Sequence, residues 1–196
     1  MADENGLACP VDEPGEIQVR AEFCMGGYLN REEVTREAYT DDGWLRTGDR
    51  AVLRADGNIR FIGRLSEMFK SGGYNVYPRE VELVLESHPS VAIAAVVGVP
   101  DPLFDEVGWA YVVPNSAGAF SEVDCRDWCS KELAGYKIPK RFILCTELPL
   151  LPIGKVDKVG LRKQATAQAL EATASQGAGS AIPRTSTSAS SIQHTA

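Results

Sequence analysis

The chain has 196 residues, of which 44% are hydrophobic, and a formal net charge of −7 at pH 7. This size and composition fit one globular domain or one and a half, and the negative charge argues against a nucleic-acid partner. No apolar run approaches the roughly 20 residues that cross a bilayer, so we expect no membrane span. The start MADENGLACPVDEPGE and the ending QHTA match neither a signal peptide nor a peroxisomal signal. We therefore expect an intracellular, cytoplasmic protein.

The five cysteines indicate packing rather than redox or metal chemistry. An odd number without a C-x-x-C pair predicts neither a disulfide framework nor a zinc site. Cys125 and Cys129 lie four residues apart beside Trp128, which is the spacing of one helix face. We expect both in a hydrophobic core, because free cysteine behaves as a small buried hydrophobe.

Short strands and turns are expected up to residue 62. Ile17 and Val19 alternate with polar residues, which is the period-two pattern of a strand. Asp56-Gly57-Asn58 is a hairpin-turn signal. The elements expected here are a strand with a glycine turn within 15–30, a short exposed helix at 31–39, and strands at 51–54 and 59–62.

Helices and apolar strands alternate in the second part of the chain. Pro78 suits the first turn of a helix, and Pro89 ends that helix. Ser121 and Asp124 have capping-box spacing at the start of another. The further elements expected are a buried strand at 91–99, its neighbour at 107–113, a helix at 121–133, an edge strand at 142–144 and a weak helix at 160–170.

The sequence predicts an α/β (α+β) fold, in which a short β-sheet is flanked by helices and preceded by a β-rich piece. From about Glu171 the composition changes to Ala, Ser, Thr and Gly. Such a segment cannot bury enough apolar surface to offset its ordering entropy. We therefore predict that residues 171–196 are disordered.

Three motifs follow one another: GWLRTGD at 43–49, GRLSEMFKSGGYNVYPREVE at 63–82 and LPIGKVDK at 151–158. In this order and spacing they resemble the C-terminal third of the adenylate-forming enzymes, the superfamily of acyl-CoA synthetases and AMP-dependent ligases. The resemblance runs from about Gly15 to about Leu161. It implies four parts: 1–62 as the end of a truncated N-terminal AMP-binding domain, 63–66 as a hinge, 67–165 as a mobile C-terminal domain, and 166–196 as a helix end and tail.

Asp49 and Arg64 are candidates for nucleotide binding. A carboxylate can accept hydrogen bonds from both vicinal hydroxyls of a ribose, although an aspartate at this place can also cap its own turn. Arg64 can equally form a surface ion pair with a carboxylate such as Glu67. The resemblance implies that Asp49 and Arg64 hold the ATP or AMP ribose. The family usually has Asp at the position of Gly63 and Lys or Asp at that of Ser66. A glycine at position 63 can make the hinge more flexible, because glycine adopts more backbone conformations.

The segment Lys70-Ser71-Gly72-Gly73-Tyr74 is a glycine-rich turn with one cation. Paired glycines let a backbone approach a ligand closely, whereas the simpler interpretation is a hairpin turn with a solvated lysine. The resemblance implies that Gly72, Gly73 and Tyr74 line the route of the CoA thiol, and that Lys70 acts in the same step.

Lys155 follows a proline and a glycine in its motif. A lysine places a compact positive charge on a phosphate, and can stabilise the charge that develops when a carboxylate attacks the α-phosphate of ATP. The alternative is a solvated surface lysine. The resemblance implies that Lys155 promotes adenylation and contacts the nucleotide, and it selects Lys155 over the nearby Lys158.

The resemblance implies an acid–thiol ligase that uses ATP, Mg²⁺ and CoA, and converts a carboxylic acid through acyl-AMP to a thioester. The family's triphosphate loop, adenine motif and acyl pocket precede the equivalent of residue 15, so we expect that this chain cannot adenylate a carboxylate alone and holds no magnesium ligand. The form SGGYNVYPREVE favours CoA ligation of a fatty or aryl acid.

Four alternatives remain for the role of the chain. It is a piece of a longer ligase, or half of a split enzyme that works with a separate N-terminal AMP-binding chain. Otherwise it is a non-catalytic relative or partner-binding module that keeps the fold, or a piece of an adenylation domain that loads a carrier protein.

Overall fold

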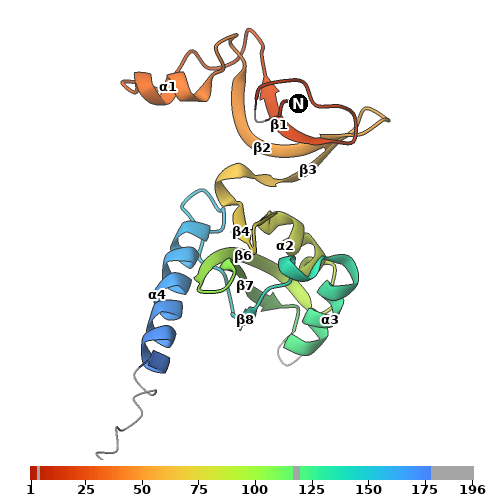
Figure 1. Ribbon diagram of the computed structural model, residues 1–196, viewed down its shortest axis with the longest axis vertical. Coiled ribbons are helices and arrows are strands. Elements are labelled where there is room, and N and C mark those ends of the chain that lie inside the picture. The colour runs from red at the N-terminus through yellow and green to blue at the C-terminus, as the bar shows by residue number, and fades with distance from the viewer. Residues whose placement is uncertain (4, 117–119, 178–196) are drawn as a thin grey trace, which may run out of the picture.

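The computed structural model describes residues 1–3, 5–116 and 120–177, which form two units joined by a short connection (Figure 1). The first unit is a three-stranded antiparallel sheet with one exposed helix. The second is a five-stranded sheet covered by helices on both faces. The expected α+β class, with a β-rich piece ahead of a helix-covered sheet, is confirmed.

The first unit contains β1 (Pro14–Val19), α1 (Glu32–Ala38), β2 (Leu45–Leu53) and β3 (Ile59–Arg64), with the strand order β1-β2-β3. The predicted hairpin is confirmed, because Arg54 and Asn58 are joined by a backbone hydrogen bond and the Asp56 carboxylate accepts from the Asn58 N–H at 3.0 Å. Strand β2 begins earlier than expected, so the TGD motif lies within the strand.

The second sheet contains five strands in the order β5-β4-β7-β6, with β8 parallel to β7. The predicted strands at 91–99, 107–113 and 142–144 are confirmed. The strands are β4 (Phe69–Ser71), β5 (Tyr74–Val76), β6 (Val91–Asp101), β7 (Asp105–Pro114) and β8 (Arg141–Leu144). In the antiparallel β6–β7 pair, Val96 faces Ala110 and Gly98 faces Gly108.

The helices of this unit pack on opposite faces of the sheet. They are α2 (Pro78–Glu86) and α3 (Glu122–Glu132) on one face and α4 (Lys158–Gly177) on the other. Val96 of β6 belongs to the core under α2 and α3, and its neighbour Val97 to the core under α4. Both faces of β6 are thus covered, which explains why its sequence is continuously apolar.

Local signals correctly predicted the starts of α2 and α3. Pro78 is at the first turn of α2, and the Ser121 hydroxyl accepts from the Asp124 N–H at 3.2 Å. Cys125 and Cys129 of α3 are fully buried in the core, as predicted.

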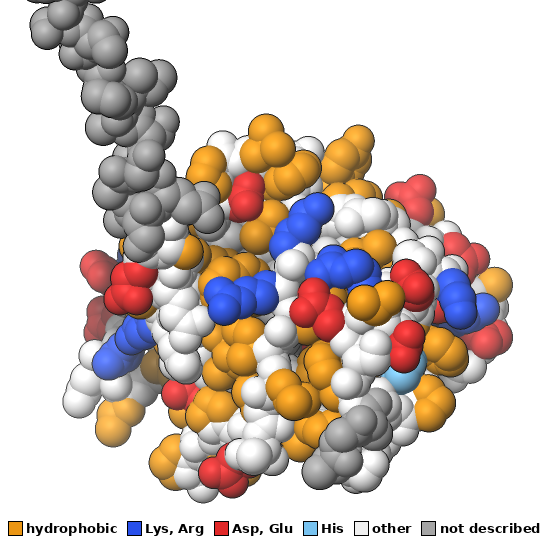
Figure 2. All heavy atoms as spheres, turned by 90° about the horizontal axis from the view of Figure 1, so that it is seen from below, with side chains coloured by type: hydrophobic (Ala, Val, Ile, Leu, Met, Phe, Trp, Pro, Cys, Tyr) orange, Lys and Arg blue, Asp and Glu red, His pale blue; other side chains and the backbone are white. Residues whose placement is uncertain are grey.

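Helix α4 is longer than the sequence suggested. It begins at Lys158 and continues to Gly177, so residues 171–177, which were predicted to be disordered, are helical. The remainder of that predicted tail, 178–196, lies outside the described residues. Among the described residues, no helix combines the length and apolar character that a membrane span requires. Figure 2 shows charged side chains of both signs interleaved with hydrophobic ones on the face seen from below.

Candidate functional site

Asp49 and Arg64, the two predicted ribose ligands, are in direct contact. They lie opposite each other on β2 and β3, and the Arg64 Nε donates to Asp49 Oδ1 at 2.9 Å. Asp49 lies in a strand rather than a turn, so the turn-capping interpretation of Asp49 does not hold. Arg64 does form a partly exposed ion pair, as its simpler interpretation predicted, but the partner is Asp49 rather than Glu67. Both side chains are partly exposed, so a ligand can reach them.

The connection between the two units runs through the end of β3 and the 3₁₀ turn η1 (Leu65–Glu67). Gly63 is buried here against Tyr77, the residue that precedes α2. A Cβ on Gly63 would lie 3.1 Å from the Tyr77 Cβ. The guanidinium of Arg50 is 6.0 Å from the centre of the Tyr77 ring. The glycine therefore permits the first unit to approach Tyr77 closely, a steric role that its sequence context did not reveal.

The Lys70–Tyr74 segment forms the hairpin that the simpler interpretation predicted. Strands β4 and β5 are joined by Gly72 and Gly73, whose φ angles of +57° and +85° suit a type I′ turn and favour glycine. The Gly72 N–H donates to the carbonyl of Phe104 at 2.8 Å. Lys70 is exposed on this hairpin, which leaves its ammonium accessible to a ligand.

Two aromatic residues that the sequence did not single out lie beside this hairpin. The ring of Tyr136 stacks on Tyr74, with centroids 4.7 Å apart, and Phe104 lies 3.6 Å from the Cβ position of Gly72. Tyr74 is still 60% exposed. No local pattern could have found these neighbours, because they come from distant parts of the chain.

Lys155 lies just after a tight turn between β8 and α4. The Leu151 N–H donates to the Lys155 carbonyl at 2.7 Å, and the Gly154 N–H donates to the Leu151 carbonyl at 2.8 Å. The backbone of Lys155 is thus held while its side chain is exposed. Within the described part of the chain, no hydrogen bond or ion pair engages its ammonium group.

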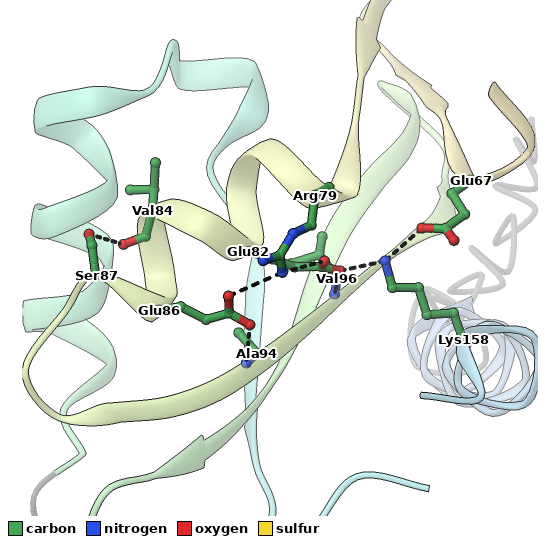
Figure 3. Close-up of polar contacts among 9 residues, drawn as sticks. All are labelled: Glu67, Arg79, Glu82, Val84, Glu86, Ser87, Ala94, Val96 and Lys158. Carbon is green, nitrogen blue, oxygen red and sulfur yellow. Dashed lines mark hydrogen bonds and ion pairs between the residues drawn. The ribbon is translucent and has the colours of Figure 1, made fainter. Parts of the chain in front are cut away.

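Lys158, three residues later, forms ion pairs with two carboxylates (Figure 3). Its Nζ lies 2.6 Å from Glu67 Oε2 and 2.8 Å from Glu82 Oε1. Glu82 is 2% exposed and also accepts from the Val96 N–H at 2.9 Å. The resemblance selected Lys155 over Lys158, and the sequence analysis did not identify Glu82. No local sequence pattern distinguishes this buried glutamate from an exposed one on the same helix.

The structure brings together only part of the predicted set. Asp49 and Arg64 are in contact, whereas Lys70 and Lys155 lie on separate hairpins of the second unit. Among the described residues, neither lysine forms a hydrogen bond or ion pair with Asp49 or Arg64. Any shared ligand must therefore bridge the two units, or the units must move relative to each other.

The buried cysteines do not contribute chemistry. Burial raises the pKa of Cys129 to about 11 and raises the pKa of Cys125 as well, so both thiols stay protonated at neutral pH and are poor nucleophiles. In the described ranges, no cluster of three or more His, Cys, Asp or Glu side chains could hold a metal ion.

Residues 80–155 match the family model of the AMP-binding enzyme C-terminal domain. Two curated relatives are similar over most of the chain. The sulfoacetate–CoA ligase of Cupriavidus necator is 43% identical over 82% of this chain. The feruloyl-CoA synthase of an Amycolatopsis species is 40% identical over 84%. The chain spans about a third of each relative, 32% and 33% of their lengths.

A solved structure agrees with these matches. The o-succinylbenzoate CoA synthetase of Bacillus subtilis, in complex with its acyl-adenylate intermediate, is 37% identical and superposes with a TM-score of 0.75. The superposition covers 82% of this chain and 33% of that protein.

Proposed function

This chain belongs to the AMP-forming acyl-CoA ligase superfamily and corresponds to the C-terminal portion of its members, and we propose that it supplies the mobile catalytic domain of an acid–thiol ligase. The reaction has two steps. A carboxylate attacks the α-phosphate of ATP, which gives acyl-AMP and pyrophosphate. The CoA thiol then attacks the acyl carbon, and AMP leaves as the thioester forms.

The observation that carries this proposal is the contrast between the two lysines of the third motif. Lys158 is used by two carboxylates, whereas the Lys155 ammonium is exposed on a turn whose backbone is hydrogen-bonded. A lysine held this way can be presented to the α-phosphate. There it stabilises the charge of the transition state more than that of the ground state.

Asp49 and Arg64 would hold the nucleotide's ribose. Arg64 occupies one oxygen of the carboxylate, Oδ1, so Oδ2 is the natural acceptor for a ribose hydroxyl. The guanidinium has further N–H donors that can reach a ribose oxygen. The pair thus supplies both an acceptor and donors at one place.

The Gly72–Gly73 hairpin would take part in the second step. With no side chain at the turn, the backbone can lie close to the pantetheine arm of CoA. Tyr74, stacked on Tyr136, forms one exposed wall beside it, and Lys70 adds a positive charge on the same hairpin. We assign this hairpin to thioester formation and Lys155 to adenylation.

Because the two lysines lie on separate hairpins, a rotation about residues 63–66 would present them in turn. We propose that 1–62 close the N-terminal AMP-binding domain, that 63–66 form the hinge and that 67–165 form the moving domain. Gly63 and Tyr77 form a contact between the two units that such a rotation must change.

The triphosphate site, the adenine site, the acyl pocket and the ligands of the Mg²⁺ that accompanies ATP would belong to an N-terminal AMP-binding portion, either in the same polypeptide or in a separate chain. Phe23 and Leu29 of the first unit are 88% and 90% exposed. Ile59 and Phe61 are exposed on β3, an edge strand of its sheet. Exposed apolar side chains on an open sheet edge are suited to contact with another domain.

A chimera tests this function. The N-terminal portion of the Amycolatopsis feruloyl-CoA synthase is joined to residues 15–196 of this chain, and ferulate-dependent ATP–pyrophosphate exchange is measured. We expect Lys155→Ala to lower exchange about 10²–10³-fold and to spare CoA transfer from supplied feruloyl-AMP. Lys163→Ala, on the exposed side of α4, is the matched control. Equal loss of both steps would refute the role of Lys155, and an inactive parent chimera would favour a non-catalytic module.

A further inference from the structure

The side chain of Glu82 lies where three elements of the second unit meet (Figure 3). It projects from α2, accepts from the backbone N–H of Val96 on β6, and binds Lys158 at the first residue of α4. Arg79 lies 3.6 Å from its second oxygen. A buried carboxylate needs such partners, because an uncompensated charge in the interior is strongly unfavourable.

Lys158 extends this cluster to the connection between the units. Its ammonium also binds Glu67, the last residue of η1. Glu67 directly follows the proposed hinge at 63–66. One lysine side chain therefore joins the end of that hinge to α2, β6 and the start of α4.

The same lysine is rigidly connected to Lys155 through the backbone. Val156 forms a β-bridge with Leu150, and the Asp157 N–H donates to the carbonyl of Pro149 at 2.8 Å. Asp157 also accepts from the Gly160 N–H at 2.9 Å, which caps α4. Two residues with fixed backbone, Val156 and Asp157, thus separate Lys155, whose ammonium is free, from Lys158, whose ammonium is bound.

We propose that Lys158, held by Glu82 and Glu67, is a positioning residue that fixes the Lys155 loop relative to the hinge. Turning the hinge then carries Lys155 as part of one rigid body. This inference rests on the proposed role of Lys155 in adenylation. The expected sensitivity is high, because a displacement of about 1 Å in a reacting group can lower a rate 10²-fold.

A role in stability alone does not account for this arrangement. A buried ion pair is often replaced by apolar side chains without loss of stability, so packing does not require a charged residue here. Glu67 is partly exposed and adds little to the core. What the pair with Glu67 does supply is a defined position for the turn η1 relative to the Lys155 loop.

Amide hydrogen exchange on the whole chain tests the positioning directly, without any activity. The variants are Lys158→Met and the double variant Lys158→Met/Glu82→Gln, which leaves no buried charge if the single change prevents folding. Glu67→Gln, at a partly exposed site, removes only the contact with η1. Lys163→Met is the control on the same helix.

We expect the hydrogen-bonded amides of Leu151, Gly154 and Asp157 to exchange about tenfold faster in the Lys158 variants, the factor that corresponds to loss of a charged hydrogen bond. Amides in the centre of β6 and β7 should be unchanged. Loop amides that keep their parental rates in the folded double variant and in Glu67→Gln would overturn the proposal.

The chimera separates this inference from the proposed function. We expect Lys158→Met to lower kcat for pyrophosphate exchange about 10²-fold, to leave the KM for ATP unchanged, and to spare CoA transfer from feruloyl-AMP. Lys158→Arg should restore much of the rate. If Lys155→Ala is inactive in exchange while Lys158→Met is fully active, the inference fails and the function stands. If neither change affects pyrophosphate exchange, the proposed role of Lys155 in adenylation fails. The amide hydrogen exchange measurement then decides by itself whether Lys158 positions the Lys155 loop.

Discussion

Arg64 Nε and Asp49 Oδ1 lie 2.9 Å apart across neighbouring strands. Their pairing joins the last strand of the first unit to the strand that carries the TGD motif, immediately before the connection to the second unit. It also orients the carboxylate, since one oxygen is occupied and the other remains for a ligand. A sugar bound at Oδ2 would therefore meet an acceptor whose direction is already fixed.

Asp49→Asn should weaken nucleotide binding more than it affects folding. The amide keeps the shape but loses the charge, and hydrogen bonds to charged groups contribute roughly 1.5–3 kcal/mol. We expect the KM for ATP of the chimera to rise at least about tenfold, while the midpoint of thermal unfolding changes little, because exposed ion pairs contribute about 1 kcal/mol or less. Asp56→Asn, in the β2–β3 turn, is the control. An unchanged KM in Asp49→Asn would contradict the assignment.

Gly63→Ala should destabilise the contact between the two units. Its Cβ would lie 3.1 Å from the Tyr77 Cβ, and Tyr77 is buried. Overpacking of this kind costs about 1 kcal/mol or more, which urea unfolding of the whole chain can measure. Gly26→Ala, where nothing lies within 4 Å of the new Cβ, is the matched control. Equal stability of the two variants would show that the approach of Gly63 to Tyr77 is not needed.

Gly98→Ala should have a larger effect. The added Cβ would lie 2.5 Å from the Cβ of Phe69, a fully buried ring in the core under α2 and α3. Neither backbone strand can retreat without breaking the sheet, so we expect a loss of about 3 kcal/mol. Denaturant unfolding gives the value, and Gly135→Ala, an open site, is the comparison. If Gly98→Ala lowers the free energy of unfolding less than Gly63→Ala does, the packing of β4 on β6 is contradicted.

The stability of the chain should fall at alkaline pH through Cys129. Burial raises its pKa from 9.0 to about 11, so the unfolded chain loses this proton at a lower pH than the folded chain does. The stabilisation that comes from the raised pKa of Cys129 is fully present below pH 9 and is lost as the pH rises toward 11. We expect a loss of about 2–3 kcal/mol over this interval relative to Cys129→Ala. If the free energies of unfolding of the parent chain and of Cys129→Ala change in parallel with pH, Cys129 makes no such contribution.

Much of the second unit was predictable because its signals are local. The proline at the start of α2, the Ser121 cap of α3 and the continuous apolar run of β6 each act over a few residues. The motif containing Lys155 was also recognisable, since its turn is closed by residues within the motif. The prediction from composition failed at the end of the C-terminal helix, since residues 171–177 continue a helix whose first turns pack on β6 and β7 through Leu161 and Ala165.

The sequence by itself determined the order of the elements, the superfamily motifs and the identities of the candidate residues, because periodicity, capping and turn chemistry depend on neighbours in the chain. Only the tertiary structure decided that Asp49 pairs with Arg64, that Gly63 lies against Tyr77, and that Lys158 joins Glu82 to Glu67. These contacts depend on sheet register and on how helices dock. No short-range pattern encodes them, since each partner is also compatible with solvent exposure until the fold brings it to its neighbour.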